Sequence, residues 1–178
     1  MKEELRLFIK GLINDVPPVV YIGLVAVFCF GMVFLIVFKR RKNINGLCRL
    51  LLLEYIALIY CSTVIFRKVN DVRKYEYIPF WSYDNMELLV ENIMNVIVFI
   101  PLGFLFGIAV KKKKWWQVLL IGGCISGSIE FLQLLLKKGV SEFDDIMHNT
   151  LGCMIGYGIF ALIKFCYDKF SSKKRAVA

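Results

Sequence analysis

Polar side chains recur at helical spacing inside the apolar stretches of this sequence. Glu91 and Asn95 are four residues apart and share one face of a helix, with Asn92 at the edge of that face. In a later stretch Glu130 and Gln133 are three residues apart and also share a face. Carboxyl and carboxamide groups can bind cations, exchange protons, and donate or accept hydrogen bonds. The spacing therefore predicts a polar site between helices.

A third stretch begins with an acidic pair. Asp144 and Asp145 precede an apolar run, and Asn149 follows one helical turn later. At a rise of 1.5 Å per residue, Asn95 and Glu130 lie only about 12 Å and about 9 Å from the nearer ends of their helices. Polar groups inside a membrane are costly and usually mark a site. We expect one polar pocket lined by eight side chains: Glu91, Asn92, Asn95, Glu130, Gln133, Asp144, Asp145 and Asn149.

The elements that must position these side chains are membrane spans. The 178 residues are 58% hydrophobic, and their mean hydropathy is +0.65, which is too apolar for an ordinary soluble domain. A span needs about 20 predominantly apolar residues. Five stretches qualify, so we predict an all-α, polytopic membrane helix bundle with five transmembrane helices: Val19 to Phe38, Leu47 to Phe66, Leu88 to Val110, Trp115 to Leu136 and Ile146 to Ile163.

The N-terminal 18 residues are predicted to form an interfacial leader to a single membrane domain covering residues 1–178. Residues 3–14 have one apolar and one charged face, which is typical of an amphipathic helix lying in the membrane interface. A disordered leader is the alternative. The first span ends in a basic run, residues 39–42, without a small-residue cleavage site, so it reads as a retained span and not as a signal peptide.

The basic residues are distributed unevenly between the two sets of loops. The N-terminus with residues 67–87 and 137–145 holds nine basic and ten acidic residues, whereas the other set holds fourteen basic residues and one acid, Asp168. The positive-inside rule places the second set in the cytoplasm. We expect the N-terminus outside, the C-terminus inside, and the polar pocket facing outward. The net charge of +9 is thus explained by topology and contact with the lipid bilayer, and no nucleic-acid partner is expected.

Small residues recur four apart in the last three predicted spans and not in the first two. Small residues at this spacing allow helix backbones to approach closely. We therefore expect the last three spans to form the compact core, packed through Gly103, Gly107, Gly123, Gly127, Gly152 and Gly156.

Three interpretations of the polar residues remain open. In a catalytic one, Glu91 or Glu130 acts as a general base, and Asp144 with Asp145 binds a divalent cation or a cationic group. The chain carries no HExxH, Ser-His-Asp or similar catalytic motif, so whether it is an enzyme is uncertain and a non-enzyme is favoured. In a structural interpretation, the carboxamides only form hydrogen bonds between helices. A binding role suits the carboxyl groups best, because like charges in low dielectric need protons, cations or a ligand.

No cofactor or metal site is expected. The six cysteines lie in or at the ends of the predicted spans without a CxxC pair, and the sequence has one histidine, His148. This pattern implies neither a disulfide framework nor a zinc site, and a single histidine excludes His-rich metal chemistry.

Several short runs together resemble the VanZ-like family. They are NVIVFIPLG from Asn95 to Gly103, the Glu130 and Gln133 pair, EFDD from Glu142 to Asp145, NTLG from Asn149 to Gly152, and the Pro-Phe element ending at Phe80. The resemblance covers about residues 50 to 165, which makes residues 47–166 a VanZ-like core. Family members often carry an arginine just before the acidic pair. Here the segment reads Lys137-Lys-Gly-Val140, and lysine lacks the planar fork of a guanidinium.

The resemblance implies a small multi-pass protein of the bacterial cytoplasmic membrane whose namesake confers resistance to the glycopeptide teicoplanin. We expect the pocket to engage a cell-envelope component, such as a cell-wall precursor lipid, or an envelope-directed glycopeptide or lipopeptide antibiotic, and so to lower susceptibility. The alternatives are a membrane enzyme that modifies a lipid-linked envelope precursor, and a small transporter or scaffold subunit. The oligomeric state is not predicted.

Overall fold

The computed structural model describes residues 17, 22, 44–84, 86–110 and 114–177, with residues 44, 45, 84 and 171–177 described by backbone only. The predicted interfacial helix, residues 3–14, lies outside the described residues. So does the predicted first span, residues 19–38, apart from Ile22.

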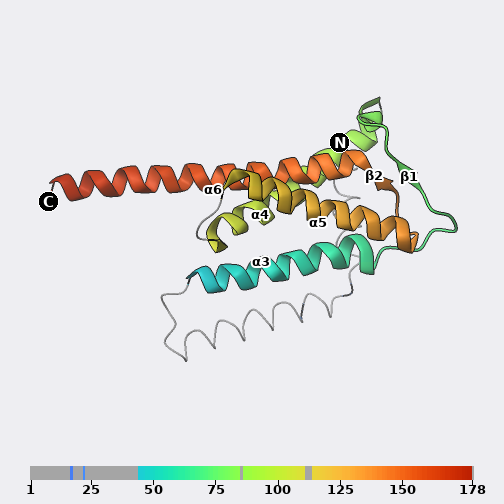
Figure 1. The fold of residues 1–178 in the computed structure, drawn as a ribbon, viewed down its shortest axis with the longest axis horizontal. Helices are drawn as coiled ribbons and strands as arrows, with labels where there is room; N and C mark the ends of the chain where they lie inside the picture. The colour runs from blue at the N-terminus through green and yellow to red at the C-terminus, as the bar shows by residue number, and fades with distance from the viewer. Residues whose placement is uncertain (1–16, 18–21, 23–43, 85, 111–113, 178) are drawn as a thin grey trace.

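Long helices dominate the described part of the chain, and the element labels follow Figure 1. Four segments are long and apolar enough to cross a membrane: Gly46–Ile65, Met86–Ala109, Trp115–Leu136 and Phe143–Phe170. They belong to α3 (Ile44–Tyr60), which continues into a π-helical turn η1 (Cys61–Ile65), and to α4 (Met86–Ala109), α5 (Trp115–Leu136) and α6 (Phe143–Val177). The prediction of a polytopic helical membrane protein is confirmed, with four of the five predicted spans observed.

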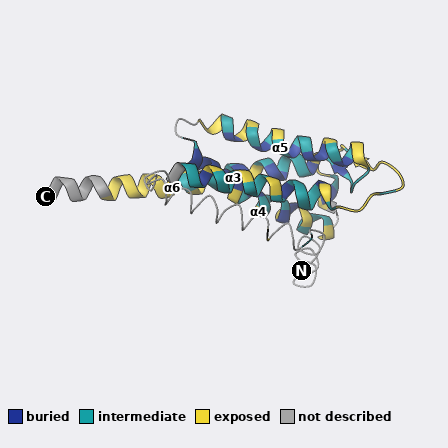
Figure 2. Ribbon diagram, turned by 90° about the horizontal axis from the view of Figure 1, so that it is seen from below, coloured by how far each residue is buried: buried dark blue, intermediate teal, exposed yellow. Residues whose placement is uncertain are grey.

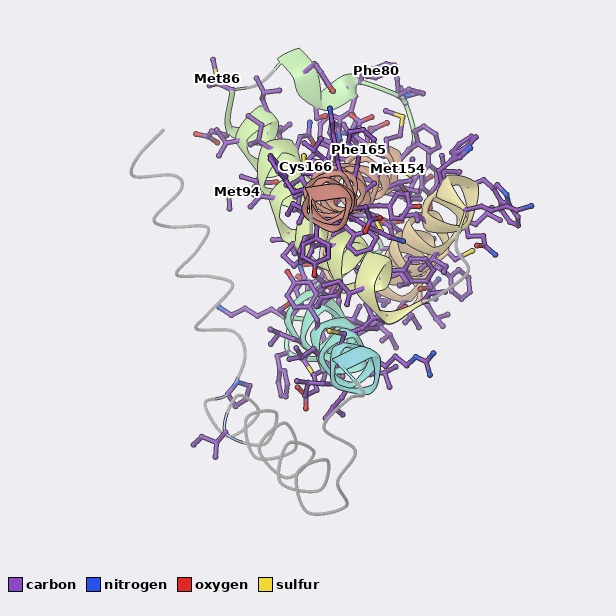
Figure 3. All side chains as sticks on the ribbon, turned by 90° about the vertical axis from the view of Figure 1, so that its left-hand side faces the viewer. Phe80, Met86, Met94, Met154, Phe165 and Cys166 are labelled. Carbon is purple, nitrogen blue, oxygen red and sulfur yellow. The ribbon has the colours of Figure 1, made fainter. Side chains whose placement is uncertain are left out.

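The helices pack in an order that differs from their order in the chain. Seen along the bundle, α6 lies between α4 and α5, and α3 packs against α4 (Figure 3). The core of buried apolar side chains runs along these contacts and includes Ile59, Phe99, Leu102, Ile129 and Cys153. Figure 2 shows that burial ends where α6 extends beyond the other helices. All residues from 161 to 170 are exposed.

Glycines bring α4 and α6 into backbone contact. A Cβ on Gly103 would lie 1.8 Å from the carbonyl oxygen of Cys153, and one on Gly156 would lie 1.9 Å from that of Ile100. A Cβ on Gly152 would likewise lie 2.1 Å from a carbonyl oxygen of α4. At Gly107 a Cβ would meet the ring of Phe160 at 2.6 Å. Such close approach requires residues without side chains.

The expected packing role of two glycines in α5 differs from the structure. A Cβ on Gly127 would meet no heavy atom within 4 Å, and one on Gly123 would meet only Thr150 Oγ1, at 3.7 Å. Gly123 instead lines an apolar groove of about 470 Å³ between α5 and α6. The close approach to α6 is made by Gly122, where a Cβ would lie 3.0 Å from Cys153 Cβ. Successive helical residues point about 100° apart, so one position decides which face a glycine occupies.

Backbone carbonyl groups near both irregular helical regions accept hydrogen bonds from side chains of other helices. In η1 the Phe66 amide bonds to the Cys61 carbonyl, and the Thr63 carbonyl accepts a hydrogen bond from Gln133 Nε2 at 3.2 Å. In α4, Pro101 lacks the amide hydrogen that a helix needs at that position. The amide missing at Pro101 would have bonded the Ile97 carbonyl. At the next residue, the Val98 carbonyl accepts a hydrogen bond from the Tyr55 hydroxyl of α3 at 2.6 Å. Polar contacts of this kind satisfy backbone groups that lipid cannot.

Two loops meet where α3 and α5 end and α4 and α6 begin, and we call this end of the bundle the polar end. Strand β1 (Tyr75–Glu76) pairs in parallel with β2 (Ser141–Glu142), and the 3-10 turn η2 (Trp81–Asp84) leads toward α4. Helix α6 begins at Phe143, three residues before the predicted start of the span. The acidic pair therefore lies in its first turn, where negative charge is favoured.

Helix α6 is also longer than predicted at its other end, where it continues to Val177. Its 35 residues correspond to about 52 Å at 1.5 Å per residue, well beyond the roughly 30 Å of a hydrocarbon core. The additional turns project past the bundle (Figure 1).

Candidate functional site

All eight predicted pocket residues lie in α4, α5 or α6 toward the polar end. Asn92, Glu130, Gln133, Asp144 and Asn149 are buried, Asn95 and Asp145 are half-buried, and Glu91 is exposed. Gln133 and Asn149 apart, they fall into two groups. One group holds a loop onto α6, and the other brings carboxyl groups together.

The first group, which we call the Asp144 clasp, consists of Asp144, Ser82 and Asn92. Asp144 is fully buried, and its carboxylate accepts hydrogen bonds from the Phe80 amide at 2.7 Å, the Ser82 amide at 3.3 Å and the Ser82 hydroxyl. Asn92 Nδ2 donates to Ser82 Oγ at 2.7 Å. Phe80 has a φ of 65°, a conformation that few residues other than glycine adopt, and these bonds hold it there. Asp144 thus anchors the loop before α4.

His148 extends the same contact by one helical turn. Its side chain is 7% exposed, with Nδ1 2.6 Å from the Asp144 carbonyl oxygen and Nε2 2.9 Å from the Tyr83 hydroxyl. The carbonyl oxygen can only accept, so Nδ1 carries a proton in this contact. Nδ1 thus bonds within α6, whereas Nε2 contacts Tyr83 of the loop that Asp144 holds.

The second group, which we call the carboxylate cluster, consists of Glu91, Glu130, Glu142 and Asp145. Asn95 Nδ2 of α4 donates to Asp145 Oδ1 of α6 at 2.6 Å. Glu130 of α5 is 3% exposed and accepts from the Glu142 amide at 2.9 Å. Three helices and β2 therefore contribute acidic side chains to one region.

Arg67 supplies a positive charge to this cluster. It follows η1, and its guanidinium lies against Gly139, where a Cβ would fall 2.5 Å from Arg67 Cζ. Gly139 also has a φ of 80°, so glycine is required there on both counts. Arg67 interacts electrostatically with all four members of the cluster. The guanidinium missing before the acidic pair in sequence is thus supplied from a different element, beside the same segment.

The charge of the cluster is reflected at Glu142, which lies just before α6. The pKa of Glu142 is raised from 4.5 to about 7, mainly by burial and then by the carboxylates of Asp145, Glu91 and Asp144, whereas Arg67 lowers it. The guanidinium does not offset burial and the surrounding acids together. Glu142 can therefore hold a proton near neutral pH.

Two carboxamides at the edge of the cluster have unused acceptor atoms. Gln133 is 2% exposed and Asn149 is 5% exposed, and their amide groups donate to the Thr63 carbonyl and, at 2.9 Å, to Ser126 Oγ. Gln133 Oε1 and Asn149 Oδ1 are buried and accept no hydrogen bond from the described residues. They lie one turn from Glu130 and from Asp145, respectively, on the same helix faces.

Several of these groups were not predicted as pocket residues: Arg67, Ser82, Tyr83, Ser126 and Glu142. Only Glu142 had a signal in the sequence, since it belongs to the EFDD run. Within the described ranges, no group of three or more His, Cys, Asp or Glu side chains is arranged to hold a metal ion. Chemically, the arrangement can share protons and bind a positively charged group.

Comparison with known proteins identifies the family. A model of the VanZ/LLP1 family matches residues 19–164, a range that includes the predicted first span as well as the segment in which the sequence resemblance was seen. The protein is also similar to Protein VanZ of Enterococcus faecium, with 25% identity over 140 residues that cover 79% of this chain and 73% of the relative. No solved structure matches. The chain therefore belongs to the VanZ/LLP1 family of membrane proteins.

Proposed function

We propose that the polar end faces the outside of the bacterial cytoplasmic membrane and that the carboxylate cluster there binds a component of the cell envelope or an envelope-directed glycopeptide or lipopeptide antibiotic. Binding lowers the susceptibility of the cell. The outward orientation follows from the excess of basic residues in the opposite loops. The antibiotic class follows from the relationship to VanZ and its expected role in teicoplanin resistance.

One observation carries the proposal, namely that carboxyl groups of α5, β2 and α6 lie together at one end of the bundle. Glu130 accepts a hydrogen bond from the Glu142 amide there, and Asp145 accepts one from Asn95. Hydrogen bonds that only hold helices together do not require carboxyl groups to be grouped in this way. Asn92, Asn95, Gln133 and Asn149 each hydrogen-bond to another element and could serve only to hold helices together. Grouped carboxyl groups oppose one another's ionisation, so they cost stability unless they hold protons or a ligand. Costly groups kept together are typical of a functional site.

Drug susceptibility of a sensitive bacterial host that expresses the protein tests the proposal. We expect Glu130→Gln and Asp145→Asn to return the inhibitory concentration of teicoplanin to that of cells without the protein. Each substitution keeps an oxygen that can accept the hydrogen bond from the Glu142 amide or from Asn95. The fold is therefore retained while the charge is lost.

Asp71→Asn is the matched control, because it removes a carboxylate of the same loop region that is exposed and outside the cluster. It should preserve resistance. Immunoblots of washed membranes must show equal amounts of all variants. Unchanged resistance in both cluster variants would contradict the proposal. A new or missing envelope lipid in mass spectra of expressing cells would indicate an enzyme instead.

A further inference from the structure

We propose that Tyr83 and His148 form a nucleophile–base pair that accepts an acyl group at the polar end. The Tyr83 hydroxyl attacks the acyl carbon, and His148 takes the hydroxyl proton. The pair lies beside the Asp144 clasp and shares no residue with the carboxylate cluster. Its activity goes beyond the proposed function and does not depend on it.

The hydrogen bonds of His148 determine which ring nitrogen carries the proton. Nδ1 lies 2.6 Å from the Asp144 carbonyl oxygen, which can only accept, so Nδ1 holds the proton of the neutral ring. Nε2 then presents a lone pair, and the Tyr83 hydroxyl donates to it at 2.9 Å. A nucleophile within hydrogen-bond reach of a base, with the base oriented by a third group, is typical of sites that form covalent intermediates. His148 is thus placed to take the Tyr83 proton.

The two side chains differ in exposure in the way that a nucleophile and its base require. Tyr83 is 48% exposed, so an acyl donor can reach its side chain. His148 is 7% exposed and is held within the packed start of α6. The tyrosine therefore meets the substrate, while the histidine acts from behind it.

Both rings are held in place by the protein. The Tyr83 ring packs edge-on against the Phe80 ring, with centroids 5.5 Å apart, and its centroid lies 5.8 Å from that of His148. Ser82, the residue before Tyr83, bonds through its amide and its hydroxyl to the buried Asp144 carboxylate. Asp144 thereby positions the loop that carries the nucleophile and, through its carbonyl oxygen, the base. Reacting groups that are already oriented lower the barrier to reaction.

The local charge favours an uncharged acyl group over a phosphoryl group. The sequence has no lysine or arginine from Tyr75 to Val110 or from Phe143 to Ile163, the two stretches that carry Tyr83 and His148. The same stretches carry six acidic residues: Glu76, Asp84, Glu87, Glu91, Asp144 and Asp145. Phosphoryl transfer relies on cationic groups that hold the charged oxygens. An acyl carbonyl has no such requirement before it is attacked.

The step consumes no oxidant or reductant. A bond forms between Tyr83 Oη and the acyl carbon, and the bond between that carbon and the leaving group of an activated acyl compound breaks. The hydroxyl proton passes to His148 Nε2 and from there to the leaving group. The product is an O-acyl tyrosine.

Acetylation of the purified protein in detergent micelles by N-acetylimidazole tests the proposal, with imidazole as the leaving group. Mass spectrometry of peptides gives the rate at each tyrosine. Tyr75 is the internal control, because it is 64% exposed and its ring stacks on Tyr77 and not on a histidine. We expect Tyr83 to react about a hundredfold faster than Tyr75, since a positioned base contributes about that factor or more.

Two variants separate the action of the base from the placement of the loop. His148→Gln retains hydrogen-bonding groups but cannot take a proton, so the rate at Tyr83 should fall to that at Tyr75. Ser141→Ala is the matched control, because it removes the hydroxyl that lies 3.3 Å from the Tyr77 hydroxyl and leaves the pair intact. It should not change the rate at Tyr83.

Equal rates at Tyr83 and Tyr75 in the wild type would overturn the proposal, and this comparison requires no variant to fold. An unchanged rate at Tyr83 in His148→Gln would also overturn it. The same would follow from an equal loss in Ser141→Ala, since a hydrogen bond outside the pair would then matter as much as the base.

Discussion

At the residue scale, two adjacent aspartates have different surroundings and hence different roles. Asp144 is fully buried, and its oxygens are occupied by two backbone amides and the Ser82 hydroxyl. Asp145 is half-buried, bonds to Asn95, and faces other carboxyl groups. The catalytic interpretation in which the two aspartates bind a cation together is therefore not favoured. Asp144 anchors a loop, whereas Asp145 belongs to the cluster.

Asp144→Asn should destabilise the protein. An asparagine side chain keeps one acceptor oxygen and directs its NH2 group at a backbone amide that also donates. Leaving a buried donor unsatisfied costs about 1–3 kcal/mol. Chemical unfolding of the purified variant in detergent should detect a loss of this size, while Asp71→Asn should unfold as the wild type does. Equal stability of the two variants would argue against the anchoring role.

The raised pKa of Glu142 predicts a pH dependence of stability. The folded protein holds this proton up to about pH 7, whereas the unfolded chain releases it near 4.5. The folded state therefore binds more protons in this interval, and the contribution of Glu142 to stability is complete below about pH 4.5 and is lost as the pH rises through about 7.

Melting temperatures measured across this interval should decline less steeply for Glu142→Gln than for the wild type. The glutamine is neutral throughout and keeps the backbone amide that bonds to Glu130. Parallel curves for the two proteins would show that the acids around Glu142 do not hold its proton.

At the element scale, contact between α4 and α6 depends on individual glycines, and the chain contains its own control. Gly156 faces the Ile100 carbonyl, whereas a Cβ on Gly158, two residues later on α6, would meet no heavy atom within 4 Å. The two positions share a helix and differ only in what they face.

Gly156→Ala should separate the two helices and cost roughly 1–3 kcal/mol by overpacking. Gly158→Ala should leave stability unchanged or raise it by up to about 1 kcal/mol, because alanine favours the helix. Unfolding of both variants in the same detergent gives the comparison. Similar stabilities would mean that the close contact contributes little.

At the scale of the whole molecule, the orientation of the bundle decides what the polar end encounters. The two described loops at that end contribute Ser82 to the Asp144 clasp and Glu142 to the carboxylate cluster, and the opposite end carries the projecting part of α6 (Figure 1). The distribution of basic residues predicts that the polar end is outside.

Single cysteines introduced in a variant without native cysteines can establish this orientation. A membrane-impermeant maleimide added to intact cells should label Asp71→Cys, which lies in the exposed loop at the polar end. Lys114→Cys, exposed at the start of α5, should react only after the cells are opened. The reverse pattern would invert the topology and place the cluster in contact with the cytoplasm, contrary to the proposed function.

The sequence by itself was sufficient for the membrane class, four of the spans and the grouping of polar residues near their ends. These follow from hydropathy and helical periodicity, which are local properties of the chain. Residues such as Asn95 and Glu130 could be predicted as site residues, because polar groups within apolar membrane helices are rare and costly.

Only the tertiary structure decided which of these residues meet and what they contact. Gly122 packs where Gly123 and Gly127 were expected, since helix rotation depends on all neighbouring helices at once. Arg67 reaches Gly139 from a segment about 70 residues earlier in the chain, and Ser82 reaches Asp144 from another loop. No periodic pattern encodes such contacts, because they arise from how separate helices and loops pack together in three dimensions.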